Sequence, residues 1–392
     1  MMKFDFTPLV RKRFVRLADR TDRWNISGEE IQRGVLKSLL ERGGQTEYGR
    51  RYDFQDIARS SNPYERFSST VTQVGYEELR PLVMRMIRGE RDVLWRGRCR
   101  DFAQSSGTSG GKSKFIPVTE ESLKGNHYPG GADSVAHYLR QVEDSRMFSG
   151  KGFILGGSFS NTLGISSKRV HIGDLSATLI NRINPVVNLF RVPDKKTALM
   201  SDWETKLPAL VKAASAEDIT NISGVPSWFL TVLRHIMEEK GVDSIHDVWP
   251  NLEVFFHGGI SFEPYRDEYR RITDSSKMHF LETYNASEGF FAVQNDFSDS
   301  AMLLIIDRDV FYEFIPIEGE DNTPRALWEV EKGMVCEMVI TSSNGLWRYR
   351  LGDTVRIAET SPVKITIAGR TKSFINAFGE ELMEDNAERG IA

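Results

Sequence analysis

The chain has 392 residues, 40% of them apolar and 27% charged, with a formal net charge of -4. This length accommodates about two to three domains, or one large α/β domain. A slightly acidic chain offers no positive field to nucleic acid, and no apolar run reaches the roughly 20 residues of a transmembrane helix. The N-terminal stretch has no signal-peptide core, and Cys99 and Cys336 are too few for a disulfide framework. We therefore expect a cytoplasmic monomer without a nucleic-acid or membrane partner.

Residues 1–100 are predicted to be mostly helical. The clearest helix is "ISGEEIQRGVLKSLLERG" (26–43), in which apolar residues recur at helical spacing. Ser27 is a suitable N-cap for this helix, and Gly43 is a suitable end.

A loop rich in glycine and serine follows, in "QSSGTSGGKSKFIPV" (104–118). It is not a P-loop, because the spacing from Gly107 to Gly111 is one residue short and no helix follows. The Phe-Ile pair and the proline after it favour a strand. A helix begins only where Thr119 can cap "EESL". The sequence therefore predicts a strand, a polar loop and a second strand.

Helical segments then alternate with short apolar runs that end in Gly, Ser or Asn: "GFILGG" (152–157), "RVHIG" (169–173), "EVFFHGG" (253–259) and "HFLETYNAS" (279–287). Such runs are typical of strands that are buried on both faces, with ligand-facing turns at their carboxyl ends. From residue 302 onward only strands are predicted, among them "ALWEVE" (326–331), in an antiparallel sheet or small barrel. We expect an α/β fold in which residues 1–369 form one large domain and residues 302–369 its β-rich lobe.

Three further polar stretches stand at strand ends: "TYNASEG" (283–289), "WRYRLGDTV" (347–355) and "AGRTKSFINAFGEEL" (368–382). A tyrosine and a carboxylate in the first could stack on a base and ligate Mg²⁺. In the second, Gly352 turns the chain and Asp353 is placed to accept hydrogen bonds from paired hydroxyls. Taken singly, each stretch is more often an ordinary turn.

Taken together and in this order, the loop and the three stretches resemble the acyl-adenylate-forming superfamily, which includes acyl-CoA synthetases, luciferases and nonribosomal peptide adenylation domains. The chain is most similar to the auxin-responsive promoter (Gretchen Hagen) family of acyl acid–amido synthetases. That similarity includes "VWPNLEVFFHGGISFEPYRDEYRRI" (248–272) and "SGVPSWFLTVL" (223–233), and it runs from about residue 70 to the end. It implies mainly parallel sheets flanked by helices, with an antiparallel β lobe.

The resemblance implies a set of nucleotide contacts. The loop residues would hold the β- and γ-phosphates of ATP through hydroxyl and backbone N–H groups, as an anion-binding nest does: Ser105, Ser106 and Thr108, with charge from Lys112 or Lys114. The adenosine and α-phosphate contacts would come from Tyr284 on adenine, Gly258 and Gly259 beside the base, Ser287 on the α-phosphate, and Asp353 and Arg370 on the ribose. Glu288 would ligate Mg²⁺. The residues expected to act in catalysis are Glu288, Lys112 and Arg370.

The acid would bind in a pocket between the ends of the strands and the helix that contains Trp228. Four residues are expected to line this pocket: His171, Val225, Trp228 and His257. By contrast, His127 and His137 stand in a helical region, where a packed or solvated histidine is the simpler interpretation.

The implied reaction needs ATP and Mg²⁺ and joins a small carboxylic acid to an amino acid or amine. The acid attacks the α-phosphorus, pyrophosphate leaves, and the amine then opens the mixed anhydride. The same motifs would serve an acyl-CoA ligase, or a module that binds nucleotide without turnover, so both remain alternatives.

Residues 370–392 are expected to form the hinge and the first part of a mobile C-terminal domain. The rest of that domain, roughly 100 residues, is missing from the sequence together with its catalytic lysine. We therefore expect this chain alone to be impaired in adenylation.

Overall fold

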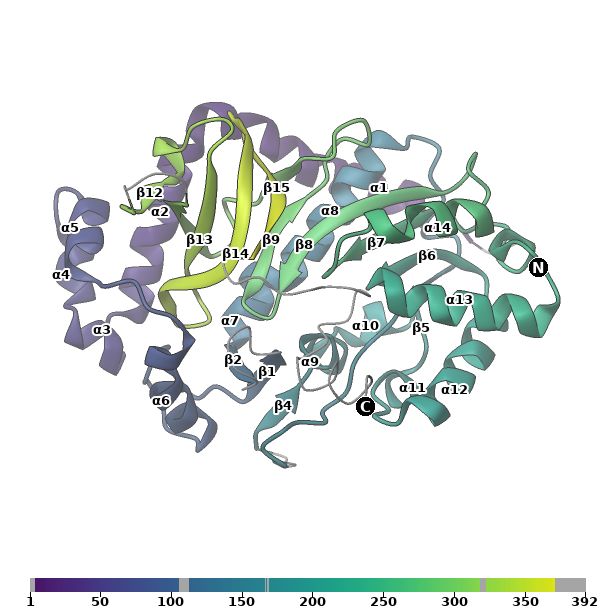
Figure 1. Ribbon diagram of the computed structural model, residues 1–392, viewed down its shortest axis with the longest axis horizontal. Helices are drawn as coiled ribbons and strands as arrows, with labels where there is room; N and C mark the ends of the chain where they lie inside the picture. Colours follow the sequence, from purple (N-terminus) through teal and green to yellow (C-terminus); the bar gives the residue numbers. More distant parts are fainter. Residues whose placement is uncertain (1–3, 106–112, 166, 168, 318–321, 371–392) are drawn as a thin grey trace, which may run out of the picture.

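The computed structural model describes residues 4–105, 113–165, 167, 169–317 and 322–370 (Figure 1). They form a mixed α/β fold, as predicted, with two sheets flanked by helices. Figure 1 shows α3, α4 and α5 at one end of the molecule and α12, α13 and α14 at the other. The sheet strands lie between these two groups of helices.

The N-terminal part of the described chain is helical up to its first strand. Its elements are α1 (Thr7–Asp19), η1 (Arg20–Arg23), α2 (Trp24–Gly43), α3 (Glu47–Arg51), α4 (Phe54–Arg59), α5 (Pro63–Thr70) and α6 (Tyr76–Ile87). The predicted end of α2 at Gly43 is confirmed, but the predicted cap is wrong. The 3₁₀ turn η1 runs straight into α2, so Ser27 lies inside the helix and its hydroxyl donates to the Arg23 carbonyl at 2.9 Å.

A small three-stranded sheet carries the predicted hairpin. It contains β1 (Asp101–Ser105), β2 (Lys114–Val118) and β4 (His171–Gly173). β1 and β2 are antiparallel, with Ser105 opposite Lys114. The predicted cap after β2 is also confirmed, because the Thr119 hydroxyl accepts from the Ser122 N–H at 2.9 Å. The elements that follow are α7 (Glu120–Ser122), the π-helical turn η2 (Leu123–His127) and α8 (Tyr128–Gln141).

The second sheet has twelve strands, and one end of it is parallel. The order there is β8-β7-β6-β3-β5, with β3 (Lys151–Ile154), β5 (Arg191–Val192), β6 (Ile219–Gly224), β7 (Val254–Gly258) and β8 (His279–Ala286). Parallel strands place their carboxyl ends at one edge of a sheet. The turns after Gly224, Gly258 and Ala286 therefore lie along the same edge, as the sequence predicted.

The other end of this sheet is antiparallel and continues without a break from β8. The order is β12-β11-β13-β14-β15-β10-β9, with β9 (Gly289–Val293), β10 (Met302–Leu304), β11 (Val310–Pro316), β12 (Arg325–Ala326), β13 (Val335–Ser342), β14 (Leu346–Thr360) and β15 (Val363–Arg370). The predicted antiparallel sheet is thus confirmed. The predicted strand 326–331 is wrong, because residues Leu327–Glu329 form the 3₁₀ turn η5, in which Glu329 accepts from the Ala326 N–H at 2.7 Å.

Helices cover the parallel strands. They are α9 (Leu175–Arg182), α10 (Pro185–Asn188), α11 (Lys195–Ala198), α12 (Trp203–Ser215), α13 (Pro226–Lys240) and α14 (Arg266–Ile272), with short turns η3 (Ile245–Asp247) and η4 (Glu263–Tyr265). Aromatic rings of Phe153, Phe229 and Phe255 pack edge to face between α13 and the sheet. Trp249 is fully buried there, and its Nε1 donates to the Ala214 carbonyl at 3.1 Å.

Within the described ranges, no helix is both long and apolar enough to span a lipid bilayer. The two cysteines are buried free thiols. Burial raises the pKa of Cys99 and of Cys336 to about 12, so neither is a reactive thiolate near neutral pH.

His127 and His137 are packed in the core, as the simpler interpretation predicted. Burial, and then the Arg140 and Arg20 cations, lower the pKa of His137 to about 3, and burial lowers that of His127 to about 4. An unfolded histidine binds a proton near pH ~6.5, whereas these native imidazoles do not. Above that pH these imidazoles are neutral in both states, so their titration does not change the free energy of unfolding. Below it the unfolded state binds protons that the native state does not, so the free energy of unfolding decreases as the pH falls.

The variant His137→Leu should make the protein less sensitive to acid. Between about pH 6 and about pH 4, the free energy of unfolding should fall less steeply, by up to about 1.4 kcal/mol per pH unit. Urea unfolding across this range measures the slope, with the same substitution at the exposed His235 as control. If His137→Leu has the wild-type slope, this histidine is protonated in the native state as well.

Candidate active site

Two of the sequence motifs meet in a direct contact between β8 and β14. The Tyr284 hydroxyl donates to Asp353 Oδ2 at 2.6 Å. These strands are not neighbours, since β9, β10 and β15 lie between them in the sheet order. A hydrogen bond to an ionised acceptor is among the stronger kinds in proteins. It fixes the half-buried Asp353 carboxylate at the carboxyl end of β8.

A bulge in β14 aims Asp353 toward this contact. Arg350 is opposite Val339 and Thr354 is opposite Glu337, so three residues of β14 face a single residue of β13. Gly352 lies inside the bulge with φ +88°, a conformation that favours glycine. The glycine before Asp353 is therefore required by the backbone.

Tyr284 is enclosed by its neighbours. Its ring lies edge to face against Phe291, with centroids 5.1 Å apart, and only 5% of the residue is exposed. Stacking of a base on Tyr284 stays a prediction, and it requires the covering atoms to move. The structure directly shows the hydrogen bond from the Tyr284 hydroxyl to Asp353.

Glu288 lies in the turn between β8 and β9 and is 6% exposed. The Asn344 amide donates to the Glu288 carbonyl at 2.8 Å, which fixes the turn against the β13–β14 connection. Burial first, and then the Glu288 charge, raise the pKa of Tyr349 well above its ordinary value. Ser287 is half-buried in the same turn.

Gly258, which ends β7, and Gly259, which follows it, are glycines for two different structural reasons. A Cβ on Gly258 would lie 2.3 Å from the Thr283 carbonyl oxygen, so no side chain fits there. Gly259 has φ +87° and is exposed. The pair leaves bare backbone at the sheet edge that also carries Tyr284 and Glu288, which fits its predicted place beside a base.

The glycine loop and the hinge are described only in part. Ser105 ends β1, while Ser106, Thr108 and Lys112 lie outside the described residues. Arg370 is the last residue of β15 and stands opposite Asp353 in the β14–β15 register. Arg370, at the predicted hinge, and Asp353, which is predicted to bind the ribose, are therefore paired across the two adjacent strands.

Three of the four predicted acyl-pocket residues lie on one side of the large sheet. His257 is 3% exposed and stacks on Phe262, with ring centroids 4.1 Å apart. Val225 precedes α13, close to Gly259, and Trp228 is 43% exposed and packs against Trp203. Burial, and then the Arg266 cation, lower the pKa of His257 to about 3, so its imidazole is neutral.

His171 lies apart from these three, in the small sheet. Its Nδ1 is 2.9 Å from Asp101 Oδ1, and Arg182 contacts the other carboxylate oxygen at 2.7 Å. This contact with Asp101 explains a histidine at this position without an acid substrate.

The chemistry of Glu288 fits one mode of Mg²⁺ binding. Among the residues that the structure describes, no group of three or more His, Cys, Asp and Glu side chains is placed to hold a metal. Mg²⁺ is commonly held by one or two carboxylates together with substrate phosphates. A single buried carboxylate beside the glycine hairpin suits an ion that arrives with a nucleotide, and does not suit a metal site made by protein alone.

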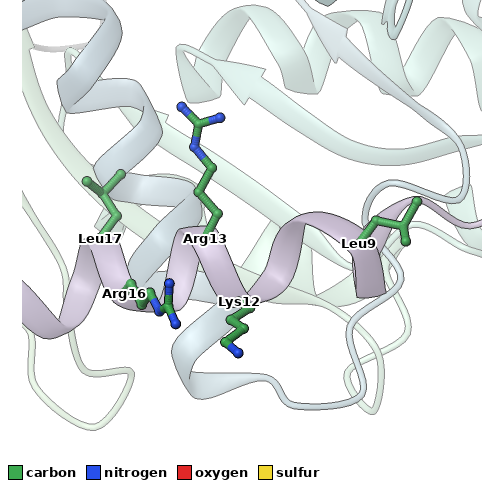
Figure 2. A pocket seen from close by; sticks show the side chains of 5 residues that line it. All are labelled: Leu9, Lys12, Arg13, Arg16 and Leu17. Carbon is green, nitrogen blue, oxygen red and sulfur yellow. The ribbon is translucent and has the colours of Figure 1, made fainter.

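Two surface hollows contain none of the candidate site residues. One, of about 570 Å³, is lined by side chains of α1 (Figure 2): Leu9, Lys12, Arg13, Arg16 and Leu17. The other, of about 370 Å³, lies between α12 and α13.

The sequence analysis assigned no role to Tyr349, the first residue of "YRLGD". Its hydroxyl accepts from Lys114 Nζ at 3.5 Å. A tyrosine at the head of a recognised motif was the available signal. Its partner could not be inferred, because β14 and β2 are far apart in sequence.

Family models match most of the chain. The "GH3 family N-terminal domain" matches residues 25–278 and the "GH3 family central domain" matches residues 303–370. Among curated relatives, the chain is 24% identical to jasmonoyl–L-amino acid synthetase JAR6 of Nicotiana attenuata, over 84% of this chain and 66% of the relative. It is also 24% identical to indole-3-acetic acid-amido synthetase GH3.4 of Arabidopsis thaliana, over 84% and 64%. The chain thus spans slightly less than two thirds of these relatives.

Solved structures share the fold. AtGH3.15 acyl acid amido synthetase in complex with 2,4-DB matches with a TM-score of 0.76 and 19% identity, covering 100% of this chain and 75% of that one. A 2-hydroxyisobutyryl-CoA ligase in complex with 2-HIB-AMP and CoA matches with a TM-score of 0.57 and 13% identity, covering 93% and 72%. The fold is therefore that of adenylate-forming enzymes.

Proposed function

The chain belongs to the GH3 family, and from this premise we propose that it activates a small carboxylic acid as an acyl-adenylate and transfers the acyl group to an amino acid or amine. The observation that carries the proposal is the Tyr284–Asp353 hydrogen bond at 2.6 Å. It joins two of the four motifs at the edge where open α/β sheets bind ligands.

The first step is nucleotidyl transfer. A carboxylate oxygen of the acid attacks the α-phosphorus of ATP. The bond between the α-phosphorus and the oxygen that bridges to the β-phosphorus breaks, and pyrophosphate leaves. In the second step the amine attacks the acyl carbon, AMP leaves, and the amine gives up a proton. Catalysis of this kind rests on positioning and on charge stabilisation, so no protein nucleophile is needed.

Each motif has a part in this reaction. Asp353, fixed by Tyr284, accepts hydrogen bonds from the ribose hydroxyls, and Arg370 stands beside it. Ser287 contacts the α-phosphate at the end of β8. The glycine hairpin holds the leaving phosphates through Ser105, Ser106, Thr108 and Lys112. Glu288 holds Mg²⁺, which supplies positive charge to the phosphate oxygens.

The acid substrate has an apolar body. Phe262, Val225 and Trp228 provide aromatic and aliphatic walls beside the glycine pair, and buried neutral His257 provides a polar group among them. A few polar groups in an apolar pocket are the usual way to orient a small ligand. The names of the curated relatives, a jasmonoyl–L-amino acid synthetase and an indole-3-acetic acid-amido synthetase, support the same substrate classes. We place the enzyme in the cytoplasm, acting as a monomer.

Acid-dependent release of pyrophosphate tests this function. The full-length protein is incubated with ATP, Mg²⁺ and a panel of carboxylic acids, and pyrophosphate is measured. Adding amino acids or CoA in parallel then identifies the acceptor by mass spectrometry of the product. We expect release with at least one acid and an amide product with amino acids. A thioester product would identify a CoA ligase, and nucleotide binding without release would identify a binding module.

A further inference from the structure

Lys206 is a buried lysine to which the proposed reaction gives no part. It lies in α12, and only 3% of the residue is exposed. Its Nζ donates to the Gly156 carbonyl at 2.5 Å and to the Gly157 carbonyl at 3.3 Å. Burial lowers the pKa of Lys206, and the Asp174 carboxylate opposes that shift. Burying a lysine costs free energy unless its ammonium group is hydrogen-bonded, and both acceptors here belong to one short turn.

This turn, residues 155–158, follows β3 at the edge of the large sheet where open α/β sheets bind ligands, and we call it the β3 turn. At its start, the Leu155 N–H donates to the Ser223 carbonyl of β6 at 3.3 Å. Directly after it, Phe159 packs against His171, with ring centroids 5.7 Å apart. The β3 turn therefore connects the small sheet, which carries His171, with the edge that carries the other predicted acyl-pocket residues.

Two residues at the start of α9 also hold the β3 turn. The Gly157 N–H donates to Ser176 Oγ at 2.8 Å, and the Ser158 N–H donates to Asp174 Oδ2 at 2.6 Å. A Cβ on Gly157 would lie 2.0 Å from the same carboxylate oxygen, so only glycine fits there. The start of α9 thus binds N–H groups of the turn, whereas Lys206 binds its carbonyls.

The helix that carries Lys206 also carries part of an aromatic pair. Trp203 lies three residues before Lys206 in α12, and this spacing places both side chains on one face of the helix. The Trp203 ring packs edge to face on Trp228, with centroids 5.3 Å apart. α12 and α13 lie side by side (Figure 1). One helix therefore holds the β3 turn and supports Trp228, which is predicted to line the acid pocket.

We propose that Lys206 is a positioning residue for the acid substrate: it ties the β3 turn to α12 and so fixes the turn relative to the Trp203–Trp228 pair, as two walls of the acid pocket. The inference rests on the proposed function, and it gives Lys206 no contact with acid or nucleotide. Two adjacent glycines have wide conformational freedom. Without the ammonium group, the bound acid itself would have to order the turn, and that ordering lowers its affinity.

The kinetics of pyrophosphate release test this inference, with the acid of the panel that gives the fastest release. Lys206→Met keeps a side chain of similar length and removes the donor. It should raise KM for the acid about tenfold to a hundredfold, the scale of a displaced binding group. The KM for ATP, the affinity for AMP and kcat at saturating acid should stay near their wild-type values, because the proposed nucleotide contacts come from other elements.

The matched control is Lys151→Met. It removes a lysine from the amino end of the same strand, β3, where Lys151 Nζ bonds to Glu217 Oε1 at 2.6 Å. This variant should leave KM for the acid unchanged. Thermal unfolding shows whether each variant is folded. If Lys206→Met does not fold, Lys206→Arg replaces it, because a longer planar cation should displace the two carbonyls and raise KM for the acid in the same direction.

Hydrogen exchange measures the turn itself. In the substrate-free Lys206→Met protein, the amides of residues 155–158 should exchange faster than in the wild type, whereas those of β7 should not. The inference is overturned by an unchanged KM for the acid, by equal losses for acid and ATP, or by wild-type exchange in the β3 turn. If the wild-type protein releases pyrophosphate with no acid of the panel, the proposed function fails, and this inference fails with it.

Discussion

Replacing Arg348 by methionine is expected to lower the free energy of unfolding by about 3–5 kcal/mol, the range for removing one partner of a buried ion pair. The side chains of Arg348 and Glu313 are 3% and 1% exposed. Arg348 donates to both Glu313 oxygens, at 2.9 and 2.7 Å, and to the carbonyls of Ser68 and Val71, each at 2.7 Å. In the variant, the buried Glu313 carboxylate and Val71 carbonyl and the partly buried Ser68 carbonyl each lose a donor.

Burial raises the pKa of Glu313, and the Arg348 cation opposes that rise. Without Arg348 the carboxylate either stays charged without its cation or takes up a proton, and each alternative costs stability. Adding Glu313→Leu to Arg348→Met should recover part of the loss, because the unpaired charge is then gone. The Ser68 and Val71 carbonyls would still lack their donor, so recovery should be incomplete.

Urea unfolding measures these differences, with Arg66→Met as control. The ion pair of Arg66 with Asp56 is about half exposed on both sides, and such pairs contribute up to about 1 kcal/mol. If Arg348→Met costs no more than Arg66→Met, the buried Arg348–Glu313 pair and the bonds of Arg348 to the Ser68 and Val71 carbonyls do not stabilise the fold as expected.

The second large effect is expected at Glu288. The variant Glu288→Gln should slow acid-dependent pyrophosphate release by about a hundredfold or more, which corresponds to the several kcal/mol that a metal ion supplies to transition-state charge. The affinity for AMP should not change, since AMP lacks the phosphates that share Mg²⁺ with this carboxylate. The amide side chain has nearly the same shape as the carboxylate, so the turn should keep its structure.

Pyrophosphate release and AMP titration on one preparation provide both readouts. A Glu288→Gln protein with the wild-type rate would show that this carboxylate does not hold the metal. Equal losses of rate and of AMP affinity would indicate that the β8–β9 turn has been disturbed instead.

Local pattern was enough to predict the hairpin and many of the strands. Apolar runs such as the one before Gly258 predicted β3, β4, β7 and β8, and the Phe-Ile-Pro run after Lys114 predicted β2 correctly. The parallel strands β5 and β6 were not predicted. Helix starts were harder, because Ser27 has the chemistry of a cap but lies within a helix that η1 had already begun. Residues 326–331 have the composition of a strand, yet Glu329 bonds back to Ala326 and forms a turn.

Contacts between motifs depended on the resemblance to known enzymes and on the structure. Nothing local to Tyr284 or Asp353 shows that their side chains meet, because three strands separate β8 from β14 in the sheet order. Tyr349 shows the same limit, since its partner Lys114 comes from another element, β2. The spacing of residues in the sequence predicts which side chains are neighbours along one strand or helix. Contacts between distant elements can be predicted only when the order of the strands in the sheet is known.

Titration of AMP into the wild-type protein and into Asp353→Asn tests most directly whether the Tyr284–Asp353 pair is a nucleotide site. The wild-type protein should bind in the micromolar range, on the order of 8 kcal/mol. Asp353→Asn should bind more weakly by about 1.5–3 kcal/mol, the scale of hydrogen bonds to a charged acceptor. No binding by the wild-type protein up to millimolar AMP, or an unchanged Kd in Asp353→Asn, would contradict the assignment.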